Sequence, residues 1–259
     1  MPSKNPLFDC VLLTNDDGIH APGLSVLEKI ATELSREVWV VAPAHDQSGV
    51  SHATSIHEPL RVEELGERRF AVRGTPGDCV ILAVKHLMSR RPSLILSGIN
   101  RGANIGIETI FSGTVGAAMS GMLLEVPSIA ISQAISPQTP VMWDTALSTG
   151  PSVLMEACEA PWARNCCLNI NLPACSPGKF RGISFTAQGR GRLNDGEVHA
   201  RRDPRNQEYF WLNLARTDNQ DDAGTETFGV LNGYATVTPL SFERTHSAAL
   251  IAMTDRQND

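Results

Sequence analysis

The sequence predicts an α/β protein whose main domain is a doubly wound, mostly parallel sheet, followed by a β-rich C-terminal extension or arm. Strand-like runs alternate with helix-like segments through the first two thirds of the chain, which is typical of a sheet covered by helices on both faces. Several runs are apolar almost without interruption, as expected for strands buried on both sides. After Pro177 the residue composition changes, and this change indicates that the extension begins there.

The first two expected elements are a strand at 8–14 and a helix at 23–34. The strand is a nearly continuous apolar run, and the helix carries apolar residues at helical spacing. Pro22 suits the first helical turn, because the N–H that proline lacks would be unpaired there. The elements expected next are a strand at 38–42, a hairpin around 56–62 and 69–73, a helix at 78–88, a strand at 94–96, a helix at 114–124, a strand at 127–132, a helix at 141–159 and a strand at 166–172.

The chain beyond residue 177 is the expected extension. Gly, Asn, Asp and Arg dominate from 189 to 224, with strand-like islands at 210–215 and 233–239. Such a segment has too few apolar residues to form a core alone. We therefore expect the main α/β domain at 1–177 and an extension at 178–259 that packs on this domain or on a partner subunit.

Composition and charge bound the class of protein. With 259 residues, the chain is long enough for one large α/β domain and an appendage. The net charge of -6 predicts no general affinity for extended nucleic acid or an anionic membrane, so an anionic substrate needs a local site. No N-terminal signal peptide or membrane span is evident, and the six cysteines lack zinc-type spacing. These features favour a cytoplasmic protein with reduced thiols.

The loop after the first expected strand contains Asn15, Asp16 and Asp17. Ligands of an open parallel sheet bind beyond the carboxyl ends of its strands, which is where this loop lies. Two adjacent carboxylates repel each other in a cleft, and a divalent cation removes the conflict, because Mg²⁺, Mn²⁺ and Ca²⁺ prefer oxygen ligands. A solvated Asp-Asp-Gly turn is the simpler interpretation, and this loop alone does not exclude it.

Two further loops follow expected strands. The loop at 42–52 offers the hydroxyl of Ser48 together with His45 and His52, which we interpret as polar loop residues. The glycine-rich loop at 97–106 leads to Ser112-Gly113-Thr114, where a helix opens with free N–H groups and a positive dipole end. Capping alone also explains the two hydroxyls and is compatible with phosphate binding. The spacing fits neither a Walker A loop nor a G-x-G-x-x-G fingerprint.

Six motifs in this order resemble the survival protein SurE family of 5′-nucleotidases. The motifs are T-N-D-D-G-I-H-A-P-G at 14–23, A-P-x-x-x-Q-S-G-x-S at 42–51, G-T-P-G-D-C-V at 74–80, S-G-I-N-R-G-A-N-I-G at 97–106, S-G-T-V-G-A-A-M-S-G at 112–121 and G-Y-A-T-V-T-P-L at 233–240. Each motif is short, but their combination is specific. The sequence departs from the family pattern at Phe111, where a tyrosine is frequent, and at Gly116, where alanine is frequent.

The resemblance implies a Rossmann-like domain with a C-terminal hairpin arm that is exchanged between subunits of a homodimer or homotetramer. It implies hydrolysis of nucleoside 5′-monophosphates, with 3′-monophosphates and short polyphosphate as further substrates in some members. One divalent ion per subunit, Mg²⁺ or Mn²⁺, is expected. The ligands that the resemblance assigns to it are Asp16, Asp17, Ser48 and Asn100, and the phosphate-binding residues that we expect are Asn15, Asn104, Ser112, Gly113 and Thr114.

Our mechanistic hypothesis makes Asp16 and Asp17 the catalytic anchors of a cation that activates a water for in-line attack. An aspartate nucleophile is the alternative within phosphatases, and the sequence does not decide between the two. A non-catalytic, metal-assisted nucleotide-binding protein is the main rival from another class. A dinucleotide-dependent oxidoreductase lacks its fingerprint in the first strand–helix loop, and a serine hydrolase lacks the G-x-S-x-G elbow.

Overall fold

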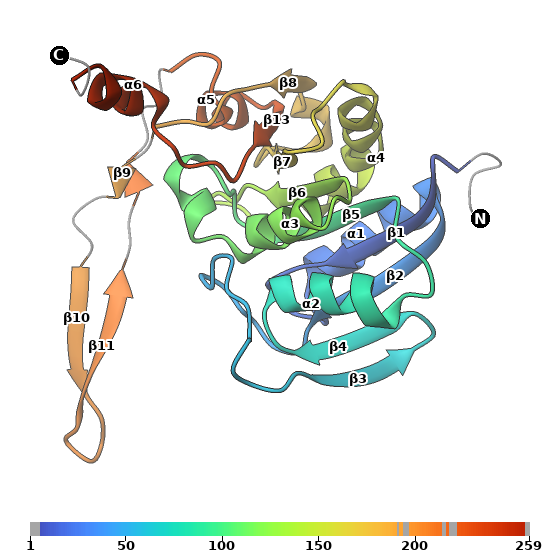
Figure 1. The fold of residues 1–259 in the computed structure, drawn as a ribbon, viewed down its shortest axis with the longest axis horizontal. Coiled ribbons are helices and arrows are strands. Elements are labelled where there is room, and N and C mark those ends of the chain that lie inside the picture. The colour runs from blue at the N-terminus through green and yellow to red at the C-terminus, as the bar shows by residue number, and fades with distance from the viewer. Residues whose placement is uncertain (1–5, 191, 194–196, 214–215, 218–221, 257–259) are drawn as a thin grey trace.

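A nine-stranded mixed sheet forms the body of the protein (Figure 1). The computed structural model describes residues 6–190, 192–193, 197–213, 216–217 and 222–256. Across the sheet, the strands are β3 (Arg61–Gly66), β4 (Arg69–Arg73), β2 (Ser35–Pro43), β1 (Phe8–Thr14), β5 (Leu94–Arg101), β6 (Ser128–Gln133), β7 (Cys167–Leu172), β13 (Ala235–Leu240) and β8 (Ile183–Phe185). The central strands from β4 to β7 are parallel, which confirms the predicted α/β class.

Helices cover both faces of the sheet. On one face, α1 (Pro22–Leu34) contacts α4 (Trp143–Glu159); on the other, α2 (Pro76–Leu82) contacts α3 (Gly113–Leu123). Strand β1 shows why two cores form. Val11 and Leu13 belong to the cluster that includes α1 and α4 residues, whereas Cys10 and Leu12 belong to the cluster on the α2 side. Each fully buried leucine stabilises the fold by about 1.5–3 kcal/mol.

Several predicted elements have different bounds in the structure. The helix expected at 78–88 begins at Pro76, where Thr75 and Asp78 form a capping box, and it gives way to a π-helical turn at Ala83–Leu87. The first strand of the expected hairpin starts at Arg61, two residues after Pro59, whose ring nitrogen cannot donate to a strand ladder. The strand expected at 94–96 continues to Arg101.

The last third of the chain contributes both to the sheet and to a projecting arm. Strands β8 and β13 extend the sheet, and Ala235 and Val237 of β13 lie in the α1-side core. Helix α5 (Glu226–Leu231) precedes β13, and α6 (Ser247–Asp255) ends the described chain. The division expected at residue 177 stays a prediction.

The arm is an antiparallel hairpin of β10 (Glu197–Arg202) and β11 (Glu208–Asn213), with β9 (Arg192–Leu193) paired to β12 (Arg216–Thr217) at its root. Figure 1 shows the hairpin projecting from the body. The expected strand at 210–215 thus begins earlier, and residues 214–215 lie outside the described residues.

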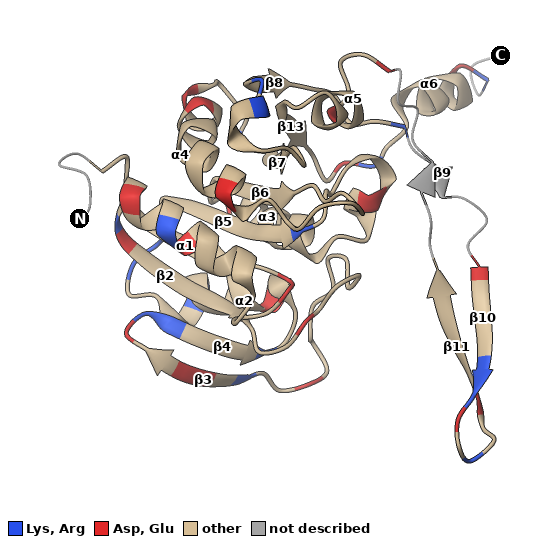
Figure 2. Cartoon of the chain, turned by 180° about the vertical axis from the view of Figure 1, so that it is seen from behind, with Lys and Arg blue, Asp and Glu red and all other residues tan. Residues whose placement is uncertain are grey.

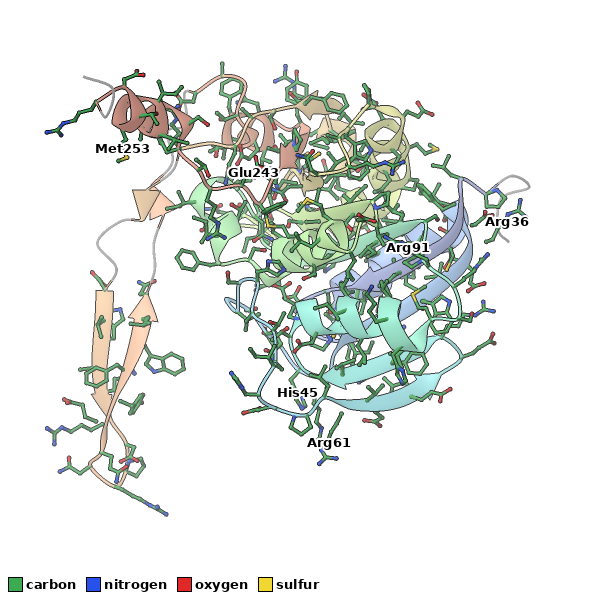
Figure 3. The ribbon with its side chains drawn as sticks, in the orientation of Figure 1. Arg36, His45, Arg61, Arg91, Glu243 and Met253 are labelled. Atoms are coloured by element: carbon green, nitrogen blue, oxygen red, sulfur yellow. The ribbon has the colours of Figure 1, made fainter. Side chains whose placement is uncertain are left out.

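Apolar side chains are exposed on the arm and on α6. Figure 3 shows the side chains of β10 and β11 standing out from the hairpin and Met253 pointing away from α6. The large exposed apolar residues of these two elements are Val198, Tyr209, Phe210, Trp211, Leu212, Leu250, Ile251 and Met253. Basic and acidic residues are interspersed over the described chain (Figure 2). Among the described helices, none combines the length and the apolar character needed to cross a membrane.

Candidate functional site

The strand order places three of the predicted loops at one point. Strand β1 lies between β2 and β5, so the chain winds to one side of β1 toward β2 and to the other side toward β5. Loops at the carboxyl ends of strands on either side of such a switch point diverge and leave a crevice. The loops after β1, β2 and β5 are those that the sequence nominates.

A cavity of about 280 Å³ occupies this point. It is lined by Asp16, Asp17, Ser48, Gly49, Asn100, Arg101, Asn104, Glu108, Phe111 and Ser112. Six of the residues expected from the sequence therefore meet in one cavity. A larger cavity of about 460 Å³ lies around Trp162 and Pro127, but it contains none of the predicted site residues. The side chains, rather than the size, identify the candidate site.

Asp16 is the most buried carboxyl group of this cavity, with 4% of its surface exposed. The hydroxyl of Thr114 donates a hydrogen bond to its Oδ1, and the backbone N–H of Gln47 donates to its backbone carbonyl over 2.8 Å. Burial raises the pKa of Asp16 to about 6; the hydrogen bond from Thr114 opposes this rise, and the nearby Asp17 adds to it. An ionised Asp16 is therefore held at a free-energy penalty that a bound cation would remove.

Asp17 is half-buried and lines the same cavity. The backbone N–H of Arg101 donates to its Oδ2 over 3.2 Å. Burial raises the pKa of Asp17, whereas the hydrogen bond from Arg101 lowers it and the carboxyl of Asp46 raises it further. The two adjacent aspartates are thus both in surroundings that disfavour their charge.

Asn100 reaches the cavity through an irregularity in β5. The register between β5 and β6 shifts between Ser97 and Asn100. Gly98 stands there at φ +141°, and a Cβ at this position would lie 2.2 Å from the carbonyl oxygen of Ile131, so only glycine fits. The Asn100 amide nitrogen donates to the carbonyl of Gly102 over 3.0 Å, which leaves the amide oxygen for a ligand.

Ser48 comes to the cavity from the loop after β2. Its backbone N–H and its hydroxyl both donate to Oδ1 of Asp46, each over 2.7 Å. This arrangement holds the Ser48 oxygen with its proton turned toward Asp46, so its lone pairs remain available to a cation.

The N-terminus of α3 packs directly on Asp16. Ser112 caps the helix, since its hydroxyl accepts from the N–H of Val115 over 3.1 Å. A Cβ on Gly113 would lie 2.8 Å from the Cβ of Asp16, so the helix approaches this closely only because residue 113 is glycine. Ser112 lines the cavity, and Thr114 bonds Asp16. The positive end of the helix dipole therefore lies beside the two carboxyl groups and offers an anion a binding site.

Asn104 is held by buried polar residues of neighbouring strands. Its backbone N–H donates to Oδ1 of Asn171 over 2.8 Å, and its side-chain nitrogen donates to Ser132 over 2.8 Å. Its carbonyl accepts from the amides of Asn169 and Asn171. These bonds fix the backbone and the side chain of Asn104 at the cavity.

Asn15, like Gly113 and Thr114, is a predicted residue that does not line the cavity. It is fully buried, and its amide nitrogen donates to the carbonyl of Gly18 over 2.8 Å, which closes the turn that carries Asp16 and Asp17. Its expected part in phosphate binding stays a prediction.

The cavity also contains residues that the sequence reasoning did not assign. Arg101 and Gly49 lie inside motifs that were recognised, and Glu108 follows the glycine-rich loop. Arg101 directly follows the predicted metal ligand Asn100 in the sequence, and this position was the available signal that it belongs to the site. Phe111, one of the departures, lines the cavity with 40% of its surface exposed. Gly116, the other departure, is explained by packing, because a Cβ there would lie 2.5 Å from the Ser51 carbonyl oxygen.

The donor set favours a hard metal ion. Within the described part of the chain, no group of three or more His, Cys, Asp or Glu residues is arranged to hold a metal. The cavity instead offers two carboxylates with hydroxyl and amide oxygens, which suit Mg²⁺ or Mn²⁺ better than zinc. His52 bonds Ser120 over 2.8 Å and does not line this cavity, as expected for a polar loop residue.

Over most of its length, the chain is similar to known proteins of one family. The family model described as Survival protein SurE matches residues 11–195. A curated relative from Burkholderia lata, 5′-nucleotidase SurE 1, is 58% identical over 251 residues, which cover 96% of this chain and 97% of the relative. A relative from Bradyrhizobium, 5′-nucleotidase SurE, is 46% identical over 243 residues, which cover 92% of this chain and 95% of the relative. The crystal structure of the SurE protein from Aquifex aeolicus aligns with a TM-score of 0.81 at 32% identity, covering 96% of this chain and 99% of that one.

Proposed function

The chain belongs to the SurE family of survival proteins, and we propose that it is a metal-dependent 5′-nucleotidase that hydrolyses nucleoside monophosphates to nucleoside and phosphate. One observation carries the proposal: two adjacent aspartates and the N-terminus of α3 face the same cavity. The first element suits a divalent cation and the second suits a phosphate. The relatives described above are named as 5′-nucleotidases, which supports the same activity.

The metal would be held by oxygen ligands from three loops. Asp16 and Asp17 supply the charge, while the hydroxyl of Ser48 and the amide oxygen of Asn100 supply neutral ligands. When bound, the ion supplies Lewis-acid chemistry, because it polarises a phosphoryl oxygen and lowers the pKa of a water. The raised pKa of Asp16 supports this assignment, since burial disfavours the charged carboxylate and a bound cation would offset that cost.

The chain itself holds the phosphate. The first N–H groups of α3, at Gly113 and Thr114, would bind its oxygens together with the hydroxyl of Ser112, which lines the cavity, and Arg101 adds a cation to the cavity wall. These donors stabilise the charge that develops on the phosphoryl oxygens in the transition state. In the reaction, an oxygen attacks phosphorus in line, the ester P–O bond breaks, and the nucleoside oxygen leaves with a proton.

The attacking oxygen belongs to water in our proposal and to an aspartate in the alternative. In the alternative, the carboxylate of Asp16 or Asp17 forms an aspartyl-phosphate that water then hydrolyses. Rapid quenching with a ³²P-labelled substrate decides between them. Label that stays on the protein and disappears in the Asp17→Asn variant would establish the aspartate route.

The roles that we propose for the site residues concern the phosphate and not the base, and we therefore extend the proposal to nucleoside 3′-monophosphates and short polyphosphate. We expect the enzyme to act in the cytoplasm. The direct test is phosphate release from a panel of nucleoside monophosphates with EDTA, Mg²⁺ or Mn²⁺. Release that requires a metal and is lost in Asp17→Asn supports the proposal. No release by the folded protein, with nucleotide binding retained, would favour the non-catalytic binding protein instead.

We also propose that the protein is a homodimer or homotetramer formed by exchange of the arm. The exposed Phe210, Trp211 and Leu212 on β11 support this, because such a run of large apolar side chains is buried in most stable proteins. Light scattering after size exclusion tests it with Trp211→Asp, which should lower the mass of the particle. An unchanged mass would argue against arm exchange.

A further inference from the structure

One buried carboxyl group connects the wall of the candidate site to the root of the arm. Glu226, at the start of α5, is fully buried. Its Oε1 accepts the backbone N–H of Gly106 over 2.7 Å, and its Oε2 accepts the N–H of Gly189 over 2.6 Å. Gly106 and Gly189 are far apart in sequence, so Glu226 joins two segments that no strand ladder joins.

The first of these segments is the wall of the candidate site. Residues 106–110 form a 3₁₀ turn between β5 and α3. Glu108, Phe111 and Ser112, in and just after this turn, line the cavity. The turn ends where α3 begins, since the N–H of Ser112 donates to the carbonyl of Glu108. A shift of Gly106 therefore moves the residues that face the substrate.

Gln188 holds the same turn from the same side. Its amide nitrogen donates to the carbonyl of Gly106 and to the hydroxyl of Thr109, each over 2.7 Å. Gly106 is thus bound through its N–H by Glu226 and through its carbonyl by Gln188. Hydrogen bonds to a carboxylate in a buried place are stronger than those between neutral groups.

The second segment is the place where the arm leaves the body. Ala187 is bridged to Thr225, the N–H of Ala187 donates to the carbonyl of Gly224, and the N–H of Glu226 donates back to Ala187. The arm begins just after Gly189 and returns just before Gly224. Glu226 and Gln188 therefore stand at the closing point of the arm as well as at the cavity wall.

We propose that Glu226 and Gln188 are positioning residues that hold the wall at 106–112 in its substrate-binding geometry and tie it to the arm root. This inference rests on the proposed nucleotidase function for its kinetic consequence. The wall faces the substrate but supplies none of the proposed metal ligands. Loss of the tie should therefore weaken substrate binding and leave the affinity for metal unchanged.

Glu226→Gln is the principal test. The amide keeps the size of the side chain but offers one acceptor and turns a donor toward one of the two N–H groups. We expect KM for the best nucleoside monophosphate to rise about tenfold, with kcat changed less than about threefold, because the lost interaction acts on bound substrate and transition state alike. The Mn²⁺ concentration for half-maximal activity should stay as in the wild type. An unchanged KM, or an equal loss in metal affinity, overturns the proposal.

Hydrogen exchange gives a readout that needs no activity. Amides of 105–112 and of 187–190 should both exchange faster in Glu226→Gln than in the wild type. Faster exchange in 105–112 alone would refute the tie to the arm root, and unchanged exchange in both would refute the whole inference. If the wild type hydrolyses no nucleotide, the proposed function fails, while the exchange experiment still tests the tie.

Two further variants complete the design. Gln188→Met keeps the length of the side chain and removes the hydrogen bonds to Gly106 and Thr109. We expect KM to rise about threefold. This variant tests the proposal if Glu226→Gln does not fold. Unchanged KM and exchange in Gln188→Met would then overturn the proposal. Glu197→Gln, an exposed carboxyl group on β10 of the arm, is the matched control and should leave both readouts at wild-type values.

Discussion

Replacing Asp16 by asparagine should stabilise the metal-free protein at pH 8 while it abolishes phosphate release. Burial raises the pKa of Asp16 from an ordinary value of 3.8 to about 6. A rise of this size corresponds to about 3 kcal/mol between the charged and neutral forms. Asparagine carries no charge, and its amide oxygen keeps the acceptor for the Thr114 hydroxyl.

The sign of the effect depends on pH. Because the folded protein binds this proton more tightly than the unfolded chain, the stability due to the neutral carboxyl is fully present below pH 3.8 and is lost as the pH rises through about 6. The gain from Asp16→Asn should therefore be close to zero at pH 4 and reach about 3 kcal/mol at pH 8. For a chain of this size, that is a rise in Tm of about 6–12 °C.

The assay is thermal unfolding in EDTA between pH 4 and pH 8, repeated with Mn²⁺. The ion should raise the Tm of the wild type and leave that of Asp16→Asn nearly unchanged, since it binds the folded state only through an intact site. Asp255→Asn, at an exposed carboxyl group near the end of α6, is the control. A variant that is no more stable than the wild type at pH 8, or a gain that does not vary with pH, would refute the reasoning.

Three further substitutions test the contacts of α3 with Asp16 and with the loop that contains Ser51. Gly113→Ala places a Cβ 2.8 Å from the Cβ of Asp16. We expect kcat/KM to fall by a factor of about 10² or more while the circular dichroism spectrum stays unchanged. Near-wild-type kinetics would contradict the close packing of α3 on Asp16. Gly116→Ala places a Cβ 2.5 Å from the Ser51 carbonyl oxygen. It should lower the free energy of unfolding, measured in urea, by about 1–3 kcal/mol. A stabilised variant would show that the loop around Ser51 moves away at little cost. Thr114→Val removes the donor to Asp16, so the Mn²⁺ concentration for half-maximal activity should rise about tenfold; an unchanged metal response would mean that the hydroxyl serves only the fold.

Local patterns were sufficient for the centre of the fold. The apolar run of β1 and the helical spacing of α1 are properties of adjacent residues, and the structure has both elements where the sequence predicts them. The elements that were not expected lack such patterns. Strand β8 has three residues, and β10 is largely charged and exposed, so their strand conformation comes from pairing rather than from periodicity.

The candidate site follows the same division. Asp16, Asp17 and Ser48 were predicted from residue type and from their place after strands, and the structure brings them to one cavity. The support of Asn104 by Asn169 and Asn171 could not be predicted, because hydrogen-bond partners 65 and 67 residues apart meet only in the folded chain. Two asparagines inside an apolar strand were the available signal, since buried amides require partners.

The bond from Thr114 to Asp16 also has a thermodynamic consequence. Thr114 belongs to the first turn of the helix that would face the proposed phosphate, and its hydroxyl donates to Asp16, a proposed ligand of the cation. A displacement of Thr114 itself would therefore act on both proposed ligand sites. Linkage then requires reciprocity: the factor by which inorganic phosphate tightens Mn²⁺ binding equals the factor by which Mn²⁺ tightens phosphate binding. If both ligands bind as we propose, they would be heterotropic effectors of each other, and the hydroxyl of Thr114 would be one contact that couples them.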